Sequence, residues 1–86
     1  MKHASDAALD QLEALLVRLR TLPRLKEKKR GIFYVKSRAF LHFHEDPTGL
    51  YADVRLSGDA FERFAVSTEA QQLAFGNRVV AFFAAV

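Results

Sequence analysis

The strongest constraint on the fold is the tetrapeptide Asp-Pro-Thr-Gly at residues 46–49. It separates two runs, residues 39–45 and 50–56, in which apolar and polar side chains alternate. Asp at the first position, Pro at the second and Gly at the fourth are each preferred in a type I turn. Two alternating runs joined by such a turn predict a β-hairpin, and the turn also sets which residues face each other.

The predicted register gives the hairpin two different faces, because successive side chains of a strand point to opposite sides. With residues 46–49 as the loop, Glu45 faces Leu50 and the pairing continues outward from there. The pairs expected on the core face are Phe43 with Ala52 and Leu41 with Val54. The pairs expected on the other face are His44 with Tyr51, His42 with Asp53 and Phe40 with Arg55.

A helix is predicted on each side of the strands. Ser5 is expected to cap the first helix, in which leucines recur at spacings of three and four residues. This helix should end near Thr21, because Pro23 disfavours a helical residue before it. Thr68 and Gln71 match a capping box, so we expect a second helix from about residue 69 to the terminus.

The remaining segments complete an antiparallel sheet. Residues 32–35, Ile-Phe-Tyr-Val, predict a strand, and residues 24–30 are expected to be a charged connector. Residues 60–66 suit either a helical turn or an edge strand, and we favour a fourth strand. Because connections are short, neighbouring strands should pair as a meander. The prediction is an α+β fold with an N-terminal helix, a three- to four-stranded antiparallel meander and a C-terminal helix, both helices lying on one sheet face.

Length and composition predict a single domain over residues 1–86, with residues 1–4 frayed. The chain has no cysteine, whereas secreted domains of this size usually carry disulfides, so we expect a cytoplasmic location. No apolar run approaches the roughly 20 residues of a membrane-spanning helix. Residues 1–10 also lack the apolar core of a signal peptide. We therefore expect no membrane partner.

The polar face of the hairpin holds the candidate ligand-binding residues, which are His42, His44, Tyr51, Asp53 and Arg55. Histidine beside aspartate is found in metal sites and in acid–base catalysis. One alternative is therefore a metal-binding protein or hydrolytic enzyme that uses His42, His44 and Asp53. The third histidine, His3, is expected in the frayed terminus, and no nucleophile motif is present. We predict no catalytic residue, no metal and no cofactor.

A second group of candidates is the basic segment at residues 24–38. It holds seven cations against one acid and is therefore +6, in a chain whose formal charge is +3. Cations attract phosphate and exposed aromatic side chains stack on bases, so this segment, which includes Phe33 and Tyr34, predicts an anionic or nucleic-acid partner as another alternative. The candidate residues are Lys26, Lys28, Lys29, Arg30, Lys36 and Arg38.

Self-association is a third expectation. If both helices cover one sheet face, the aromatic side chains of the other face, which are Phe33 or Tyr34 with Phe40 and Tyr51, form an exposed patch. Such patches mark interfaces. We therefore expect a small binding or interaction domain rather than an enzyme, with a second copy of the chain as one partner.

Two stretches of the hairpin resemble a known family. Residues 37–44, Ser-Arg-Ala-Phe-Leu-His-Phe-His, and residues 51–56, Tyr-Ala-Asp-Val-Arg-Leu, are similar to small bacterial domains labelled luciferase domain. The resemblance covers about residues 30–66 and implies a bacterial protein. The label implies a light-emitting oxygenase, but the chain has no flavin fingerprint and is too short for the barrel of a flavin luciferase. We infer no luciferase activity.

Overall fold

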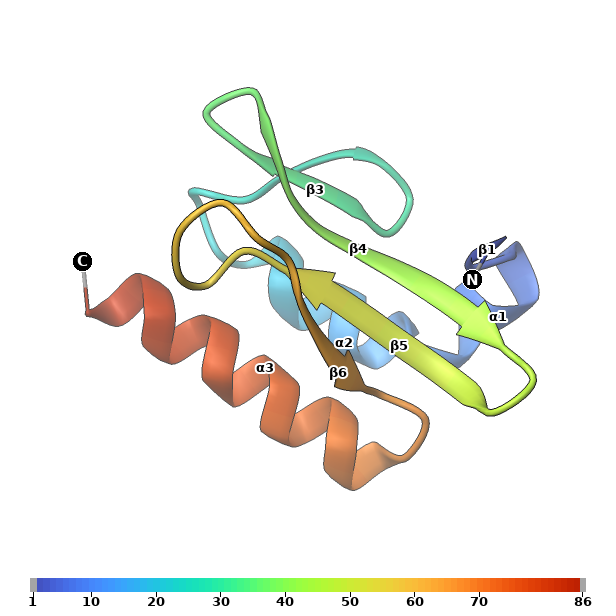
Figure 1. Cartoon of the computed structure of the whole chain (residues 1–86). Coiled ribbons are helices and arrows are strands. Elements are labelled where there is room, and N and C mark those ends of the chain that lie inside the picture. The colour runs from blue at the N-terminus through green and yellow to red at the C-terminus, as the bar shows by residue number, and fades with distance from the viewer. Residues whose placement is uncertain (1, 86) are drawn as a thin grey trace.

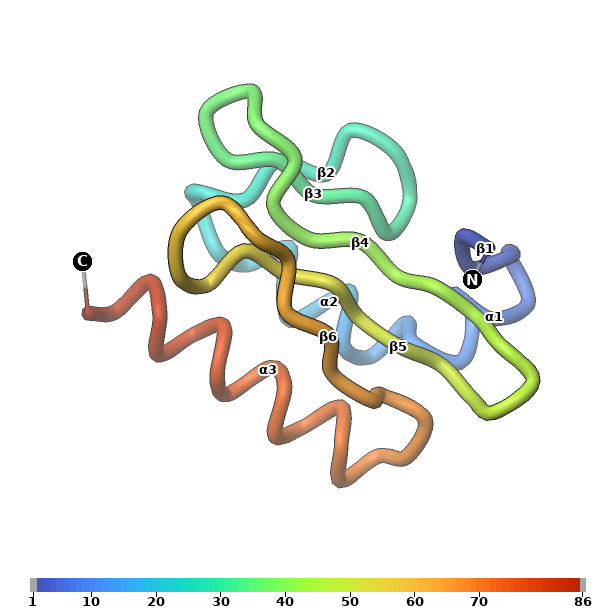
Figure 2. The backbone as a smooth tube through the Cα atoms, in the orientation of Figure 1, coloured from blue at the N-terminus to red at the C-terminus, as the bar shows by residue number. Residues whose placement is uncertain are grey.

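The computed structural model describes residues 2–85 and arranges them as a sheet with helices on one side (Figures 1 and 2). The helices are α1 (Asp6–Gln11), α2 (Glu13–Arg20) and α3 (Glu69–Ala84). The strands are β1 (Lys2–His3), β2 (Lys26–Lys29), β3 (Ile32–Val35), β4 (Arg38–Asp46), β5 (Gly49–Val54) and β6 (Glu62–Ala65). The α+β class is confirmed. Met1 and Val86, which the predicted frayed terminus and the predicted last helix include, lie outside the described residues.

The strands form one antiparallel sheet in the order β2-β3-β4-β5-β6, so each strand pairs with its neighbour along the chain. The meander is confirmed, and the favoured fourth strand is present as β6. The sheet has more strands than predicted, because β1 and β2 also belong to it. β1 pairs with β4 beyond the part that β3 occupies, with Lys2 opposite Glu45 and His3 opposite His44.

The charged connector predicted at residues 24–30 is wrong over most of its length, because β2 forms there. The turn from β2 to β3 contains Gly31 at φ +79°, a conformation that glycine adopts without a steric penalty. Lysine has a low strand propensity, so pairing with β3 rather than local sequence creates this strand. As the outer strand of the sheet, β2 presents lysines that discourage further strands from adding.

The predicted first helix is present in two pieces. Ser5 caps α1 as expected, and its hydroxyl accepts a hydrogen bond from the Ala8 amide at 3.2 Å. Leu12, at φ −100° and ψ 4°, separates α1 from α2. The predicted end is confirmed, since α2 stops at Arg20 and Thr21 is its C-cap.

The second helix also begins as predicted. Thr68 accepts a hydrogen bond from the Gln71 amide, and the Gln71 side chain accepts one from the Thr68 amide, both at 3.1 Å. Gly76 lies where α3 crosses α2. A Cβ atom at this position would be 2.7 Å from the Arg18 guanidinium and 3.3 Å from the Leu15 side chain. The glycine therefore allows the two helices to approach closely.

Both helical segments share one apolar core with the sheet, so they cover the same sheet face as predicted. The largest fully buried side chains are Leu12, Leu16 and Leu19 from the N-terminal segment, Phe33, Leu41 and Val54 from the sheet, and Val66 and Val79 from the C-terminal segment. In Figure 1, α2 passes behind β4 and β5, and the opposite face of the sheet is turned toward the viewer. Within residues 2–85, no helix has both the length and the apolar character needed to cross a membrane.

The predicted hairpin register is confirmed over five pairs, from Leu41 opposite Val54 to Glu45 opposite Leu50. The turn is held by Asp46, whose carboxylate accepts hydrogen bonds from the Thr48 amide at 3.1 Å and from its hydroxyl at 2.7 Å. The two faces of β4 and β5 therefore separate as expected from Leu41 onward.

Phe40 departs from this register. It was predicted on the polar face opposite Arg55, but it is only 6% exposed and packs against Phe82 and Phe83, with ring centroids 5.6 and 5.4 Å away. The pairing of β3 with β4 shifts by one residue at this point, which makes Phe40 the extra residue of a β-bulge. The bulge turns its side chain into the core.

Candidate metal centre

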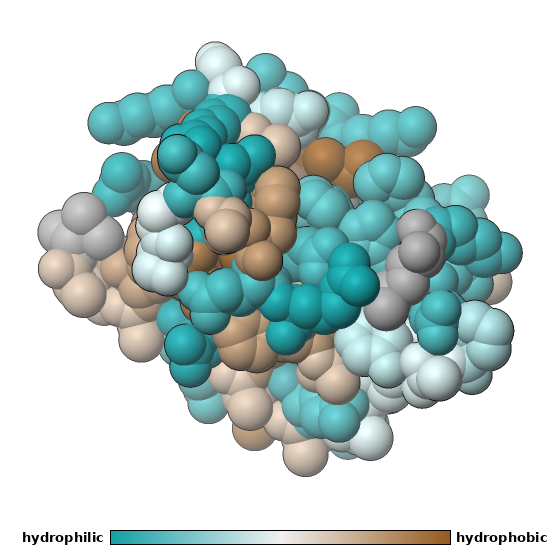
Figure 3. Space-filling view, in the orientation of Figure 1, coloured by the Kyte–Doolittle hydropathy of each residue, from teal (hydrophilic) through white to brown (hydrophobic). Residues whose placement is uncertain are grey.

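Polar side chains of four strands meet on the sheet face opposite α2. Figure 3 shows this face, with hydrophilic side chains over the part where β1, β4 and β5 lie and apolar ones over α3. The strand register sets two neighbouring rows across the sheet. One row is His3, His44 and Tyr51, and the other is His42, Asp53 and Arg63.

Three histidines from these rows form one cluster. The ring centroids are 4.8 Å apart for His42 and His44, 4.9 Å for His3 and His44, and 5.8 Å for His3 and His42. One potential ligand nitrogen from each ring lies within 4.8 Å of the other two. His3 is exposed, His42 is half-buried and His44 is buried, so the cluster opens to solvent on the His3 side.

The prediction that His3 is remote from the other histidines is wrong. The Ala4 amide donates to the Phe43 carbonyl at 3.1 Å, and the Ser5 amide donates to the Glu45 carboxylate at 2.6 Å. These bonds hold the start of the chain along β4 and bring His3 beside its partners. A strand of two residues is too short to show a periodic pattern in the sequence. The one sequence signal for an ordered His3 is that it lies two residues before Ser5, the predicted helix cap.

Asp53 connects the cluster to β6. Its side chain is 9% exposed, and its carboxylate accepts two hydrogen bonds from Arg63, both at 2.8 Å. These hydrogen bonds hold the pKa of Asp53 below its ordinary value, so the carboxylate is ionised. His42 lies opposite Asp53 in the register, as predicted, but the carboxylate reaches Nε2 of His44, at 3.3 Å.

His42 occupies the inner part of the cluster. Its ring meets the ring of Phe61 at a centroid distance of 4.7 Å, and its Nδ1 atom is buried without a hydrogen-bond partner among residues 2–85. Burial, and next the neighbouring His44, lower the pKa of His42, while Asp53 acts in the opposite direction. The ring is therefore a neutral imidazole at neutral pH, with an unsatisfied nitrogen.

The donor set suits a transition-metal ion such as zinc. Imidazole nitrogens bind zinc at about 2.0–2.1 Å, which places two ligands of a tetrahedral ion roughly 3.3 Å apart. The three rings must therefore turn to bring their nitrogens closer together, and the exposed His3 has the freedom to do so. A carboxylate beside Nε2 of His44 favours the proton on that nitrogen and leaves Nδ1 for a metal. Nδ1 lies 3.3 Å from the Lys2 carbonyl oxygen, a hydrogen bond in which Nδ1 is the donor and which metal binding would replace.

The other two predicted ligand-binding residues are engaged elsewhere. The Tyr51 hydroxyl is 2.8 Å from the Thr48 hydroxyl in the hairpin turn. Arg55 donates to the main-chain carbonyls of Ala39 and Asp59, at 2.8 and 2.7 Å. Of the five candidates on the hairpin, the structure thus brings together the two histidines and the aspartate.

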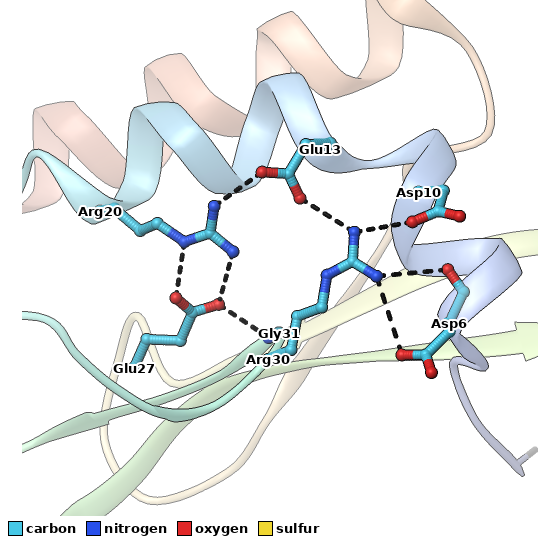
Figure 4. A network of polar contacts seen from close by, with 7 residues as sticks. All are labelled: Asp6, Asp10, Glu13, Arg20, Glu27, Arg30 and Gly31. Carbon is cyan, nitrogen blue, oxygen red and sulfur yellow. Dashed lines mark hydrogen bonds and ion pairs between the residues drawn. The ribbon is translucent and has the colours of Figure 1, made fainter.

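Arg30, one of the predicted anion-binding residues, belongs to an internal network of charges. Figure 4 shows its guanidinium facing the acids of α1 and α2. Arg30 lies 2.8 Å from Asp10 and 3.0 Å from Glu13, and Arg20 joins Glu13 to Glu27 at 2.8 and 2.6 Å. With Asp6, four acids surround these two arginines. Arg30 is therefore already neutralised within the domain.

The lysines of the basic segment remain at the surface but without exposed aromatic neighbours. The exposed ones are Lys26, Lys28, Lys29 and Lys36. Phe33 is fully buried, and the Lys28 ammonium lies over the Tyr34 ring, 4.8 Å from its centroid. Arg38 forms an ion pair with Asp59 at 2.6 Å. Because base stacking requires free aromatic faces, nucleic-acid binding stays a prediction supported by charge alone.

The aromatic patch predicted for self-association is smaller than expected. Phe33 and Phe40 both lie in the core, whereas Tyr34 and Tyr51 are half-buried on the other face. The reason is the bulge in β4, which moves one aromatic ring to the helix side of the sheet. Self-association stays a prediction, with Phe40 removed from a patch of three aromatic residues.

Comparison of the chain with protein-family models, with curated proteins and with solved structures found no match. The resemblance of the hairpin to luciferase-labelled domains therefore stays a prediction.

Proposed function

We propose that this domain binds a divalent transition-metal ion, such as zinc, through His3, His42 and His44. The observation that carries the proposal is the convergence of three imidazoles from β1 and β4 on one sheet face, with potential ligand nitrogens within 4.8 Å of each other. Imidazole is the preferred protein ligand of zinc, nickel and copper ions. The proposal gives the predicted binding domain a specific class of ligand.

Two further features support a metal ion rather than a solvated polar surface. The Nδ1 atom of His42 is buried without a donor or acceptor opposite it among the described residues, which leaves it free to bind an ion. The Asp53 carboxylate stands behind His44, in the position of the carboxylates that orient metal-binding imidazoles. Since Arg63 already holds this carboxylate, we assign Asp53 an orienting role rather than that of a free general base.

Three protein ligands leave at least one coordination position for water or an external ligand. Such open sites differ from structural zinc sites, which are closed by four protein ligands. The exposed His3 marks the side from which a further ligand enters. The metal would therefore be accessible to small molecules, and we propose binding as the activity of the site.

Calorimetry with chelator-treated protein and zinc tests the proposal, and cobalt supplies a visible spectrum for the same site. We expect one ion per chain, with shifts of all three histidine ring resonances. His3→Ala removes an exposed ligand without opening the core. Removing a residue that only orients a ligand already weakens metal binding by about tenfold or more, so loss of the ligand His3 should weaken zinc binding by more than this.

Tyr51→Phe is the matched control, because it changes the neighbour of His44 in the same row and removes no ligand. It should bind zinc as the wild type does. The proposal is wrong if zinc at stoichiometric concentration moves no histidine resonance, or if His3→Ala binds it as tightly as Tyr51→Phe.

A further inference from the structure

A second candidate site lies where the end of α3 meets β3, β4 and β5. It is a pocket of about 200 Å³ with an aromatic floor and a basic rim. The floor is made of Phe40, Phe82 and Phe83, whose ring centroids are 5.1 to 5.6 Å apart. The rim contains Arg24, Arg38 and Arg55. The histidine cluster uses none of these residues.

Among residues 2–85, only one of the three arginines is paired with a carboxylate. Arg38 pairs with Asp59 at 2.6 Å, and the Asp59 side chain is 87% exposed. Within residues 2–85, neither Arg24 nor Arg55 has a carboxylate at ion-pair distance, and Arg24 instead lies 5.6 Å from the centroid of the Phe83 ring. The rim together with Asp59 therefore carries a net charge of +2.

This imbalance sets the pocket apart from the other arginine cluster of the protein. Arg20 and Arg30 are surrounded by four acids (Figure 4), so that network has no excess positive charge. At the pocket, Arg38 and Arg55 both bind Asp59, the first through its carboxylate and the second through its carbonyl at 2.7 Å. The exposed carboxylate marks a place where an anion is stable.

The charge and the shape of the pocket define the chemistry of a ligand. A phosphate monoester carries about −1.5 to −2 charges at neutral pH, which matches the excess at the rim. The guanidinium fork binds phosphate through two parallel hydrogen bonds, and the phenylalanine floor can receive an apolar or aromatic body. A volume of 200 Å³ is below the range of about 300–1,000 Å³ typical of pockets for drug-sized ligands, which restricts the body to about one ring.

We propose that this pocket binds a small phosphate monoester whose body is a single aromatic or apolar group. The phosphate lies between Arg24, Arg38 and Arg55, and the body rests on the phenylalanine floor. None of the residues that line the pocket is a proposed metal ligand, so the pocket can be tested in the presence of a chelator.

A titration of isotope-labelled, chelator-treated protein with phenyl phosphate, followed by NMR, tests this assignment. The amide resonances of Phe82 and Phe83 should shift and saturate. Inorganic phosphate lacks the apolar contact with the phenylalanine floor, and phenol lacks the charged hydrogen bonds to the arginines. Each of these contributions corresponds to at least about a tenfold change in affinity, so both compounds should bind at least about tenfold more weakly than phenyl phosphate.

Variants locate the binding. Arg38→Gln and Arg24→Gln should each weaken phenyl phosphate binding about tenfold, the effect of losing a hydrogen bond to a charged group. Arg78→Gln is the matched control. Arg78 also lies over a phenylalanine ring, 5.1 Å from the centroid of Phe64, but it lines a different pocket. It should bind as the wild type does.

A single-stranded oligonucleotide with and without a 5′-phosphate distinguishes a free monoester from the end of a nucleic acid. Binding that requires the 5′-phosphate supports the pocket and extends its ligands to nucleotide ends. Equal binding of both oligonucleotides, with no displacement by phenyl phosphate, overturns the proposal in favour of general backbone attraction. The absence of saturable shifts at millimolar phenyl phosphate, or equal losses in Arg38→Gln and Arg78→Gln, also overturns it.

Discussion

Replacing Asp53 by asparagine tests whether a buried carboxylate holds the histidine face together. Asp53 is 9% exposed and accepts both hydrogen bonds of the Arg63 guanidinium, each 2.8 Å long. Asparagine keeps the shape and one acceptor, but its amide NH₂ group then faces a guanidinium that can only donate. One hydrogen bond is lost, and a contact between two donors takes its place.

The size of the expected loss of stability depends on how far the Asp53 and Arg63 side chains are buried. A hydrogen bond to a charged group contributes about 1.5–3 kcal/mol. The Arg63 side chain is 48% exposed, so water replaces part of the lost interaction, and we expect the free energy of unfolding to fall by about 1–2 kcal/mol. In a domain of this size 1 kcal/mol corresponds to roughly 4–8 °C, so the Tm should fall by roughly 4–16 °C.

Urea and thermal unfolding of chelator-treated protein, followed by circular dichroism, measure this loss. Asp59→Asn is the matched control, because Asp59 also forms an ion pair with an arginine, at 2.6 Å, but its side chain is 87% exposed. Its unfolding should match that of the wild type. Equal losses in the two variants, or no loss in Asp53→Asn, would refute the argument that burial decides the contribution of the pair.

The same substitution has a second consequence at the metal centre. Without the carboxylate beside Nε2, His44 loses the group that orients its ring. Loss of such a partner typically weakens metal binding 10- to 100-fold, and we expect a decrease of about this size in zinc affinity for Asp53→Asn, measured by calorimetry. Unchanged zinc affinity together with lowered stability would show that Asp53 serves the fold and not the metal.

Three more predictions concern the charge network, the contact between α2 and α3, and the attachment of β1. Burial acts to raise the pKa of Glu27, but hydrogen bonds from an arginine and a main-chain amide lower this pKa overall. The stability that Glu27 provides is therefore present above its unfolded pKa, and it is lost as the pH falls through the lower folded pKa. Urea unfolding should therefore show Glu27→Gln less stable than the wild type near neutral pH, with the difference shrinking in acid. Gly76→Ala should give less than the gain of about 1 kcal/mol usual for a helix interior, because the new Cβ displaces the end of the Arg18 side chain and comes within 3.3 Å of Leu15; thermal unfolding measures the gain. Glu45→Ala should weaken zinc binding by releasing the Ser5 amide and loosening β1, whereas Glu45→Gln keeps an acceptor and should bind nearly as the wild type does in calorimetry.

The parts of the fold that the sequence predicts correctly are specified by neighbouring residues. The turn at residues 46–49 sets the hairpin register because the backbone preferences of Asp, Pro and Gly act within four residues. Ser5 and Thr68 mark helix starts for the same reason, since each hydroxyl accepts a hydrogen bond from an amide three residues later. Local chemistry is enough for these features.

The parts that the sequence does not predict depend on distant partners. β2 consists largely of lysines and becomes a strand only because β3 lies beside it. The bulge at Phe40 arises from how β3 and β4 meet, and nothing in the alternation of β4 indicates it. β1 has two residues and is held by β4, so the approach of His3 to His44 is a tertiary event. For this last reason the sequence suggests two of the three histidines of the candidate metal centre, His42 and His44, but not His3.

Charge along the sequence is also a poor guide to charge at a site. Residues 24–38 are strongly basic, yet the fold removes Arg30 into an acidic network and spreads the lysines along a sheet edge. The local excess of positive charge appears instead where Arg24 and Arg38 from this segment meet Arg55, the residue after β5, near a single exposed carboxylate. An anion responds to the cations that surround one point, because the interaction falls with distance and is screened within about 10 Å. The pocket is therefore a stronger candidate for anion binding than the longer basic segment that suggested it.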